Sequence, residues 1–351
     1  MRHVLLAVLA LSLAACGGIA GKSQSVLPPR LMEQDSGVDV LLIAAHAVDQ
    51  DVVWASGAGG TVVKTTDGGA TWQAVPVTTP GADSLQFRDV VALDATTAWA
   101  LSIGNGPSSQ IAKTTDGGAT WRTVYQATDA DAFYDCLSMW DAQRGVVYGD
   151  SYDGRLRVLT TADGGESWQP APASALPAPA DGEGGFAASG TCVATRGAGR
   201  AWIATGNADP SRILRTTDGG ASWRAADLPL VAGEAAGATS VTFRDDRNGV
   251  AVGGDLAQGD AFLDTVARTS DGGATWTLGG ALPFPGAAYG AAYVPGSDAL
   301  LAVGPGGAGL SRDDGQTWVL VDDRTFWGVA AASREAAWLV GPDGRIVRVR
   351  L

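Results

Sequence analysis

Acidic side chains gather in the middle of the sequence, where they could bind a ligand. Asp135 follows Phe133-Tyr134, Asp150 follows Gly149, and Glu183 opens a glycine-rich stretch. Clustered carboxylates around a central depression could bind a cation, a basic peptide or sugar hydroxyls. An acid pair such as Asp135 and Glu183 could also serve as acid and base in glycan hydrolysis. The alternative is that these groups are solvated loop charges and side chains of Asx turns.

Other catalytic and metal-binding chemistry has little support. Only two histidines are present. His3 lies in the N-terminal stretch at residues 1–15, and His46 lies in an apolar run, where we expect a core or channel residue. A site with several histidine ligands is therefore not expected, and a Ser-His-Asp triad would depend on His46 alone. The glycine-rich runs at residues 57–60 and 304–309 lie between expected strands and do not open helices, as dinucleotide-binding loops do. We expect no cofactor, no metal and no catalytic residue.

Cys136 and Cys192 occupy similar positions in adjacent repeats of the sequence. In an oxidising compartment they could form a disulfide. Neighbouring repeats could equally hold them too far apart.

A motif of the form Ser/Thr-x-Asp-x-Gly-x-Ser/Thr-Trp, here called the repeat motif, occurs six times. Its aspartates are Asp67, Asp116, Asp163, Asp218, Asp271 and Asp313, and its tryptophans are Trp72, Trp121, Trp168, Trp223, Trp276 and Trp318. Successive aspartates are 42 to 55 residues apart. A period of this length predicts stacked supersecondary units, such as propeller blades.

The repeat motif is typical of a tight turn between antiparallel strands. Its Asp can accept hydrogen bonds from backbone N–H groups two residues on, and its Gly can adopt a positive φ. The Trp then opens the next strand and packs against the neighbouring unit. We expect these aspartates and tryptophans to be structural.

Each repeat predicts an inner strand, a second strand ending in Gly, a third strand running into the motif, and a fourth beginning with Trp. A seventh copy begins at Trp327 and lacks its fourth strand. Residues 23–34 are the expected donor of that strand, because closure removes open sheet edges. The sequence therefore predicts an all-β fold: one seven-bladed β-propeller of four-stranded antiparallel blades over residues 26–351, with the last blade closed by the N-terminal segment.

The repeat motif resembles the Asp-box, or BNR, repeat, which marks the turn between the third and fourth strands of a propeller blade. Phe133-Tyr134-Asp135, Gly149-Asp150, Asp153-Gly154-Arg155 and the stretch at residues 183–191 look like a bacterial branch of the photosystem II stability/assembly-factor-like propellers. This resemblance covers residues 40–351. It implies a scaffold that binds a partner polypeptide during assembly of a membrane complex, with no known catalytic residues to carry over.

Two alternatives remain. Sialidases carry similar motifs, which leaves a glycan-active hydrolase open. Sialidases also need an Arg-Ile-Pro-type motif, an arginine triad and a Tyr-Glu pair, and Pro29-Arg30-Leu31 is a poor substitute for the first. A propeller oxidoreductase rests on loose similarity only.

The loops opposite the motif turns form the expected binding face, since scaffold proteins place function on loops. Its candidate residues are Tyr134, Asp135, Asp150, Asp153, Arg155, Glu183, Asn207, Asp209, Asp255, Asp264, Arg324 and Trp327. The proline-rich link at residues 170–185 is expected to overhang the same face as a lid or, more simply, as an exposed insertion.

The N-terminus reads as an export signal. A basic start precedes an apolar run that ends in Leu13-Ala14-Ala15-Cys16, which looks like a bacterial lipobox. We expect a signal peptide at residues 1–15, a lipidated Cys16 and a flexible tether to residue 25; an ordinary cleaved secretory peptide is the alternative. We then expect the protein to face the periplasm, anchored in the outer membrane.

The net charge of −13 disfavours nucleic acid as a partner. We expect an envelope protein or peptide as partner, membrane contact through the lipid anchor only, and a monomer.

Overall fold

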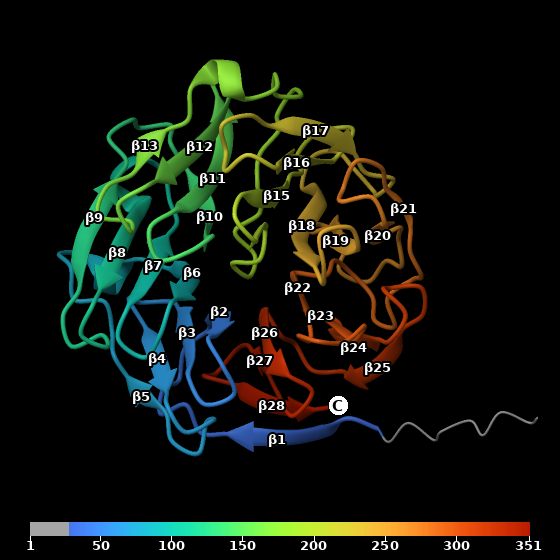
Figure 1. Ribbon diagram of the computed structural model, residues 1–351. Helices are drawn as coiled ribbons and strands as arrows, with labels where there is room; N and C mark the ends of the chain where they lie inside the picture. The colour runs from blue at the N-terminus through green and yellow to red at the C-terminus, as the bar shows by residue number, and fades with distance from the viewer. Residues whose placement is uncertain (1–27) are drawn as a thin grey trace, which may run out of the picture.

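The structure, a computed structural model, describes residues 28–351. The predicted signal peptide, Cys16 and the tether lie outside the described residues. Seven four-stranded antiparallel sheets surround one axis (Figure 1). The predicted all-β, seven-bladed propeller is thus confirmed.

Blades one to six run from the axis outward in chain order. Blade one contains β2 (Leu42–Ala47), β3 (Val53–Gly57), β4 (Val62–Thr65) and β5 (Gln73–Ala74), and blade two contains β6 (Phe87–Ala92), β7 (Ala98–Ser102), β8 (Gln110–Thr114) and β9 (Arg122–Gln126). Blade three contains β10 (Tyr134–Met139), β11 (Gly145–Tyr152), β12 (Arg155–Thr161) and β13 (Gln169–Pro170), and blade four contains β14 (Val193–Arg196), β15 (Arg200–Ala204), β16 (Arg212–Thr216) and β17 (Arg224–Asp227). Blade five contains β18 (Ala236–Phe243), β19 (Gly249–Asp255), β20 (Val266–Thr269) and β21 (Thr277–Leu278), and blade six contains β22 (Gly290–Tyr293), β23 (Leu300–Gly304), β24 (Gly307–Ser311) and β25 (Val319–Asp322).

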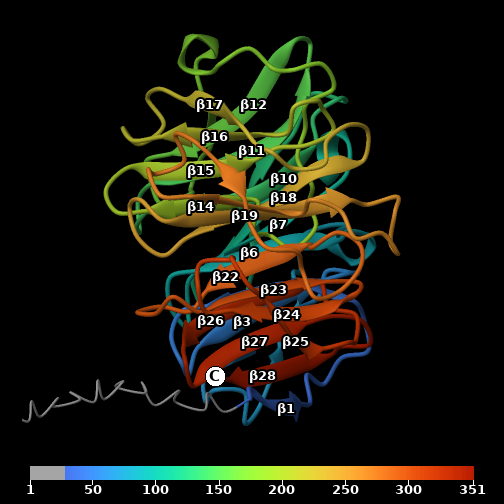
Figure 2. The same cartoon turned by 90° about the vertical axis from the view of Figure 1, so that its right-hand side faces the viewer.

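The two ends of the described chain share blade seven. This sheet holds β26 (Gly328–Ser333), β27 (Ala336–Val340), β28 (Ile346–Arg350) and, as its outer strand, β1 (Arg30–Gln34). β1 pairs antiparallel with β28 over its whole length, from Arg30 opposite Arg350 to Gln34 opposite Ile346. Closure by the N-terminal segment is therefore confirmed for residues 30–34. Figure 2 views the ring from its side, with β1 and β28 at the end opposite β12.

Tryptophans fill the spaces between blades. Trp54, Trp99, Trp202 and Trp338, one on the second strand of four blades, are fully buried. Trp54 meets the motif Trp121 of the next blade edge to face, with ring centroids 6.3 Å apart. Such aromatic pairs add about 0.5–1.5 kcal/mol to the burial of their area. The core is thus a ring of contacts between blades.

The repeat motif forms the predicted turn with a different hydrogen-bond pattern. In blade one, Asp67 accepts a hydrogen bond from the backbone N–H of Thr71 at 2.9 Å and another from its hydroxyl at 2.7 Å. The donor lies four residues on, and not two as expected. Thr65, at the start of the motif, accepts from the N–H of Gly69, which has a φ of +83°. The other five motifs repeat these bonds.

The inner strand of blade four begins only at Val193. Residues 184–190, here called the central segment, instead cross the axis of the ring. Ala187 accepts a hydrogen bond from Arg88 of blade two at 3.1 Å, and Ser189 donates one to the carbonyl of Tyr289, just before blade six, at 2.7 Å. These contacts explain why the segment is not a strand.

Candidate functional site

Strand direction separates the molecule into two faces. The repeat motifs join third to fourth strands on one face, here called the motif face. The second-to-third turns and the links between blades lie on the other, here called the link face. Every predicted binding residue belongs to a loop or strand end of the link face, but these residues do not meet at a single site.

The central segment fills the expected depression and buries its carboxylates. Asp135 is 1% exposed, and Asp89, which the sequence analysis did not single out, is 2% exposed. Burial raises the pKa of Asp135 well above its usual value, and the negative charge of Asp150 adds to the effect. Burial also raises the pKa of Asp150, although its carboxylate accepts a hydrogen bond from the N–H of Gly185 at 2.8 Å. Asp150 therefore bonds to the central segment through Gly185, whereas one buried oxygen of Asp135 has no hydrogen-bond partner among the described residues.

Glu183 is committed to structural contacts. Its carboxylate forms a bidentate ion pair with Arg212, with one N–O distance of 3.0 Å. It also accepts hydrogen bonds from the hydroxyl of Thr205 and the N–H of Ala180, both at 2.8 Å. Both oxygens are therefore occupied, so Glu183 and the buried Asp135 are poorly placed to act as an acid and base on a glycan.

Four further predicted residues are each held by local partners. The side chains of Asn207 and Asp255 accept hydrogen bonds from the N–H groups of Ala235 and Ala257, respectively. Arg324 forms ion pairs with Asp322 and Glu33. The ring of Trp327 lies against Tyr289 and Arg88. Asp153 and Arg155 lie exposed beside the turn between β11 and β12, and Asp209 and Asp264 are exposed on blades four and five.

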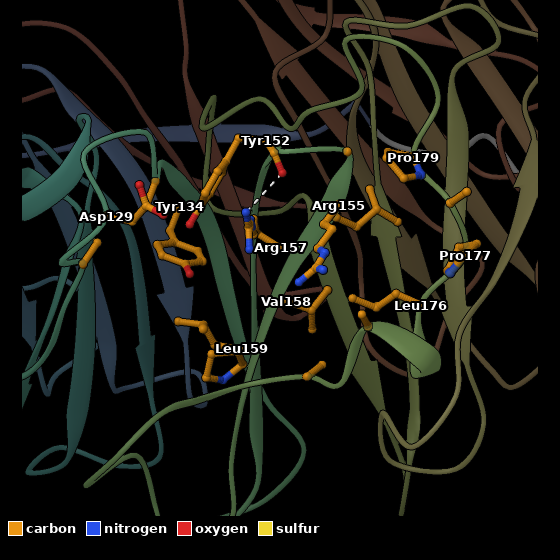
Figure 3. A pocket seen from close by; sticks show the side chains of 18 of the residues that line it. Asp129, Tyr134, Tyr152, Arg155, Arg157, Val158, Leu159, Leu176, Pro177 and Pro179 are labelled. Carbon is orange, nitrogen blue, oxygen red and sulfur yellow. Dashed lines mark hydrogen bonds between the residues drawn. The ribbon is translucent and has the colours of Figure 1, made fainter.

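A cavity of about 580 Å³ lies on the flank of the ring, at the outer side of blade three. This flank pocket is lined by residues of blade two, by β12 and by the proline-rich link at residues 170–179. Its main side chains are Tyr125, Tyr134, Tyr152, Arg155, Arg157, Leu176 and Pro177. Figure 3 shows Tyr134 and Tyr152 on one side of Arg155 and Leu176 and Pro177 on the other. Of the predicted binding residues, only Tyr134 and Arg155 line it.

Tyrosines form one wall of the flank pocket. The hydroxyls of Tyr125 and Tyr134 lie 3.3 Å apart, and their rings meet edge to face at 5.6 Å. The guanidinium of Arg157 lies 3.3 Å from the ring centroid of Tyr152, and its Nη2 donates to the carbonyl of the same residue at 3.1 Å. Burial raises the pKa of Tyr134 and Tyr152, so both hydroxyls stay protonated and able to donate.

The lining of the flank pocket holds more basic than acidic side chains, although the chain as a whole is acidic. Within residues 28–351, neither Arg155 nor Arg157 forms an ion pair, and the buried Nε of Arg157 has no hydrogen-bond partner. Asp129 is the acidic residue in the lining. The pocket therefore offers aromatic surface, hydroxyl donors and two guanidinium groups, which suit a ligand that carries a carboxylate.

No sequence pattern predicts Tyr125, Tyr152 and Arg157 in this pocket, or Arg88 and Asp89 at the centre. Pro172 was the available signal, because proline has no N–H to donate to a neighbouring strand and so predicts an early end of the fourth strand. No residue pattern reveals the surroundings of Arg88 and Asp89, because these depend on the path of the central segment.

The remaining candidates have structural surroundings. Cys136 and Cys192 form a disulfide between blades three and four, with Cα atoms 5.9 Å apart. His46 lines the channel between the inner strands, and burial lowers its pKa to about 4.

Among the described residues, no group of three or more His, Cys, Asp or Glu side chains could hold a metal ion. No helix of residues 28–351 has the length and apolar character needed to cross a membrane.

Comparison with known proteins gives a fold and no family. No protein-family model and no curated protein matches the chain. Solved structures do match. A structure of YCF48 bound to D1 peptide aligns with a TM-score of 0.63 and 16% identity over 93% of this chain and 96% of that one.

Two further structures align as well. YCF48 from Cyanidioschyzon merolae has a TM-score of 0.63 and 15% identity, over 91% of this chain and 98% of that one. The WD40 repeats of RRP9 have a TM-score of 0.64 and 11% identity, over 92% and 97%. Because all three identities are low, these likenesses demonstrate the propeller fold alone, and this chain is a seven-bladed β-propeller with YCF48 among its structural neighbours.

Proposed function

We propose that this protein is a non-catalytic scaffold of the bacterial envelope that binds a segment of a partner protein in its flank pocket. The observation that carries the proposal is the pocket itself, whose tyrosines and unpaired arginines are the residue types that dominate binding energy at protein interfaces. The structural neighbour YCF48, which has been solved with a D1 peptide bound, supports a polypeptide as the ligand.

The cellular setting is part of the same proposal. The repeat motif is of the Asp-box type, and the chain is a lipoprotein relative of the photosystem II assembly-factor-like propellers, anchored in the outer membrane through Cys16 and facing the periplasm. The signal-like sequence before Cys16 supports this setting, and the buried Cys136–Cys192 disulfide suits an oxidising compartment. The protein acts as a monomer.

Affinity capture from detergent-solubilised envelopes tests the proposal. The full chain with Arg155→Glu reverses one exposed charge at the pocket, and Arg224→Glu makes the same change on the outer strand of blade four, where Arg224 is also exposed and has no ion pair within the described residues. Wild type and the Arg224 variant should enrich one envelope protein that the Arg155 variant loses. Equal enrichment by all three, or by none, would contradict the pocket assignment.

A further inference from the structure

Blade three has a gap in the hydrogen bonds of its outer edge. In blades one, two and four, the residue five positions before the motif hydroxyl accepts a bond from the chain just after the fourth strand. These bonds are Val77 N–H to Gly60 at 2.9 Å, Ala127 N–H to Ser109 at 3.0 Å, and Leu228 N–H to Ser211 at 2.9 Å. The equivalent residue of blade three is Leu156, and within the described chain no fourth-strand N–H bonds to its carbonyl.

The early departure of the fourth strand causes this gap. β13 pairs only Pro170 with Leu159 and Gln169 with Thr160, and the N–H of Ala171 adds a last bond to Val158 at 2.8 Å. The chain then turns away through a short 3-10 turn, η3 (Ala173–Ala175), and the carbonyl of Ala175 accepts a bond from Trp223 of blade four. No residue of this link lies beside Leu156 as a strand.

The backbone of Leu156 faces the gap. The carbonyl of Val158, two residues along β12, points away from β11 and accepts a hydrogen bond from Ala171. The alternation of an antiparallel strand therefore directs the N–H and C=O of Leu156 away from β11 as well. Leu156 also lines the flank pocket. Leu156 is only 4% exposed, so this unpaired strand edge lies deep in the pocket, between an aromatic wall and an aliphatic one.

We propose that the flank pocket binds its partner as an added strand, in which an extended peptide pairs with the outer edge of β12 at Leu156 and completes the sheet of blade three. Successive side chains of such a strand point alternately to the two walls. An acidic side chain of the peptide pairs with Arg155 or Arg157, neither of which has an ion pair within residues 28–351. The partner is thus an extended, carboxylate-bearing segment, and main-chain bonds give much of its affinity.

This inference rests on the proposed function and can fail separately from it. The probe is a fluorescein-labelled synthetic peptide of alternating valine and threonine with one central glutamate, titrated with the purified full chain. Two matched peptides carry N-methyl groups on alternate residues. In one peptide the methyl groups block the N–H groups along one edge of the strand, and in the other they block those along the opposite edge. An added strand uses only one of its edges, so one set of methyl groups should weaken binding by about tenfold and the other by less than about twofold.

Amide hydrogen exchange gives an independent readout. The unmodified peptide should slow exchange of the Leu156 amide and leave that of Leu310, on β24 of blade six, unchanged. Equal effects of both methylated peptides, or no binding at millimolar concentration, would overturn the strand model. If Arg155→Glu still abolishes envelope capture in that case, the pocket binds its partner in another way. If capture is insensitive to Arg155→Glu, the proposed function itself fails.

Discussion

Gln34, on the first described strand, and Trp338, on the last blade, are 304 residues apart in the sequence and joined by a hydrogen bond. The indole N–H of Trp338 donates to the Gln34 side-chain oxygen at 3.2 Å. The same oxygen accepts from Trp72 of blade one at 3.2 Å, while the Gln34 amide donates to the carbonyl of Gly68 at 3.0 Å. One side chain therefore ties the closing strand to blades one and seven.

Replacing Gln34 with leucine should destabilise the closed ring. The change leaves two indole N–H groups and one carbonyl without these partners, and we expect the free energy of unfolding to fall by about 1–3 kcal/mol. Urea denaturation measures this difference. Gln73→Leu, on the exposed outer strand of blade one, is the matched control. A Gln34 variant as stable as this control would argue against the tie.

The motif aspartates should make the fold sensitive to acid. Hydrogen bonds from Ser167, first from its hydroxyl and then from its backbone N–H, lower the pKa of Asp163 to about 2 from 3.8. Because the folded-state pKa lies below the unfolded one, the ionised carboxylate stabilises the fold above pH 3.8, and this contribution is lost as pH falls towards 2. Asp163→Asn should be less stable than wild type at pH 7, with the difference narrowing by pH 2. A difference that stays constant with pH would contradict the assignment.

Asp135 should change the pH dependence of stability in the opposite direction to the motif aspartates. Burial, with a smaller contribution from Asp150, raises its pKa above 3.8, and Arg88 offsets this only in part. Its protonated form is therefore favoured in the fold, so stability declines as pH rises from 3.8 towards the folded-state pKa. Asp135→Asn should be more stable than wild type at pH 7 and equal to it below pH 3.8 in urea titrations. The exposed Asp323→Asn is the matched control, and loss of stability in Asp135→Asn at pH 7 would refute this prediction.

The disulfide should contribute a large share of the stability of blades three and four. Cys136 and Cys192 are both fully buried and close a loop of 56 residues. Loss of a crosslink over such a loop costs about 2–4 kcal/mol. The double variant Cys136→Ala/Cys192→Ala should show this loss in denaturant titrations under oxidising conditions and become insensitive to dithiothreitol. Equal stability of the variant and the oxidised wild type would be inconsistent with a disulfide in the folded protein.

The fold could be predicted from the sequence because it depends on local signals that repeat. Each motif fixes its own turn, and β1, which ends at Gln34, supplies the outer strand of blade seven, as the incomplete seventh repeat predicts. The candidate site depends on non-local placement. Whether Asp135 is open or buried is decided by residues 184–190, and the edge at Leu156 is open because Ala175 contacts another blade. Proline positions indicated a short strand but could not indicate which side chains would line the resulting pocket.

Site-specific photo-cross-linking in living cells tests the central claim most directly. A photoreactive amino acid replaces Arg155 at the flank pocket or Thr217 on the motif face, both of which are exposed. Our account predicts a discrete adduct with one envelope protein from position 155 and none from position 217. No adduct at position 155, or the same adduct from both positions, would contradict it.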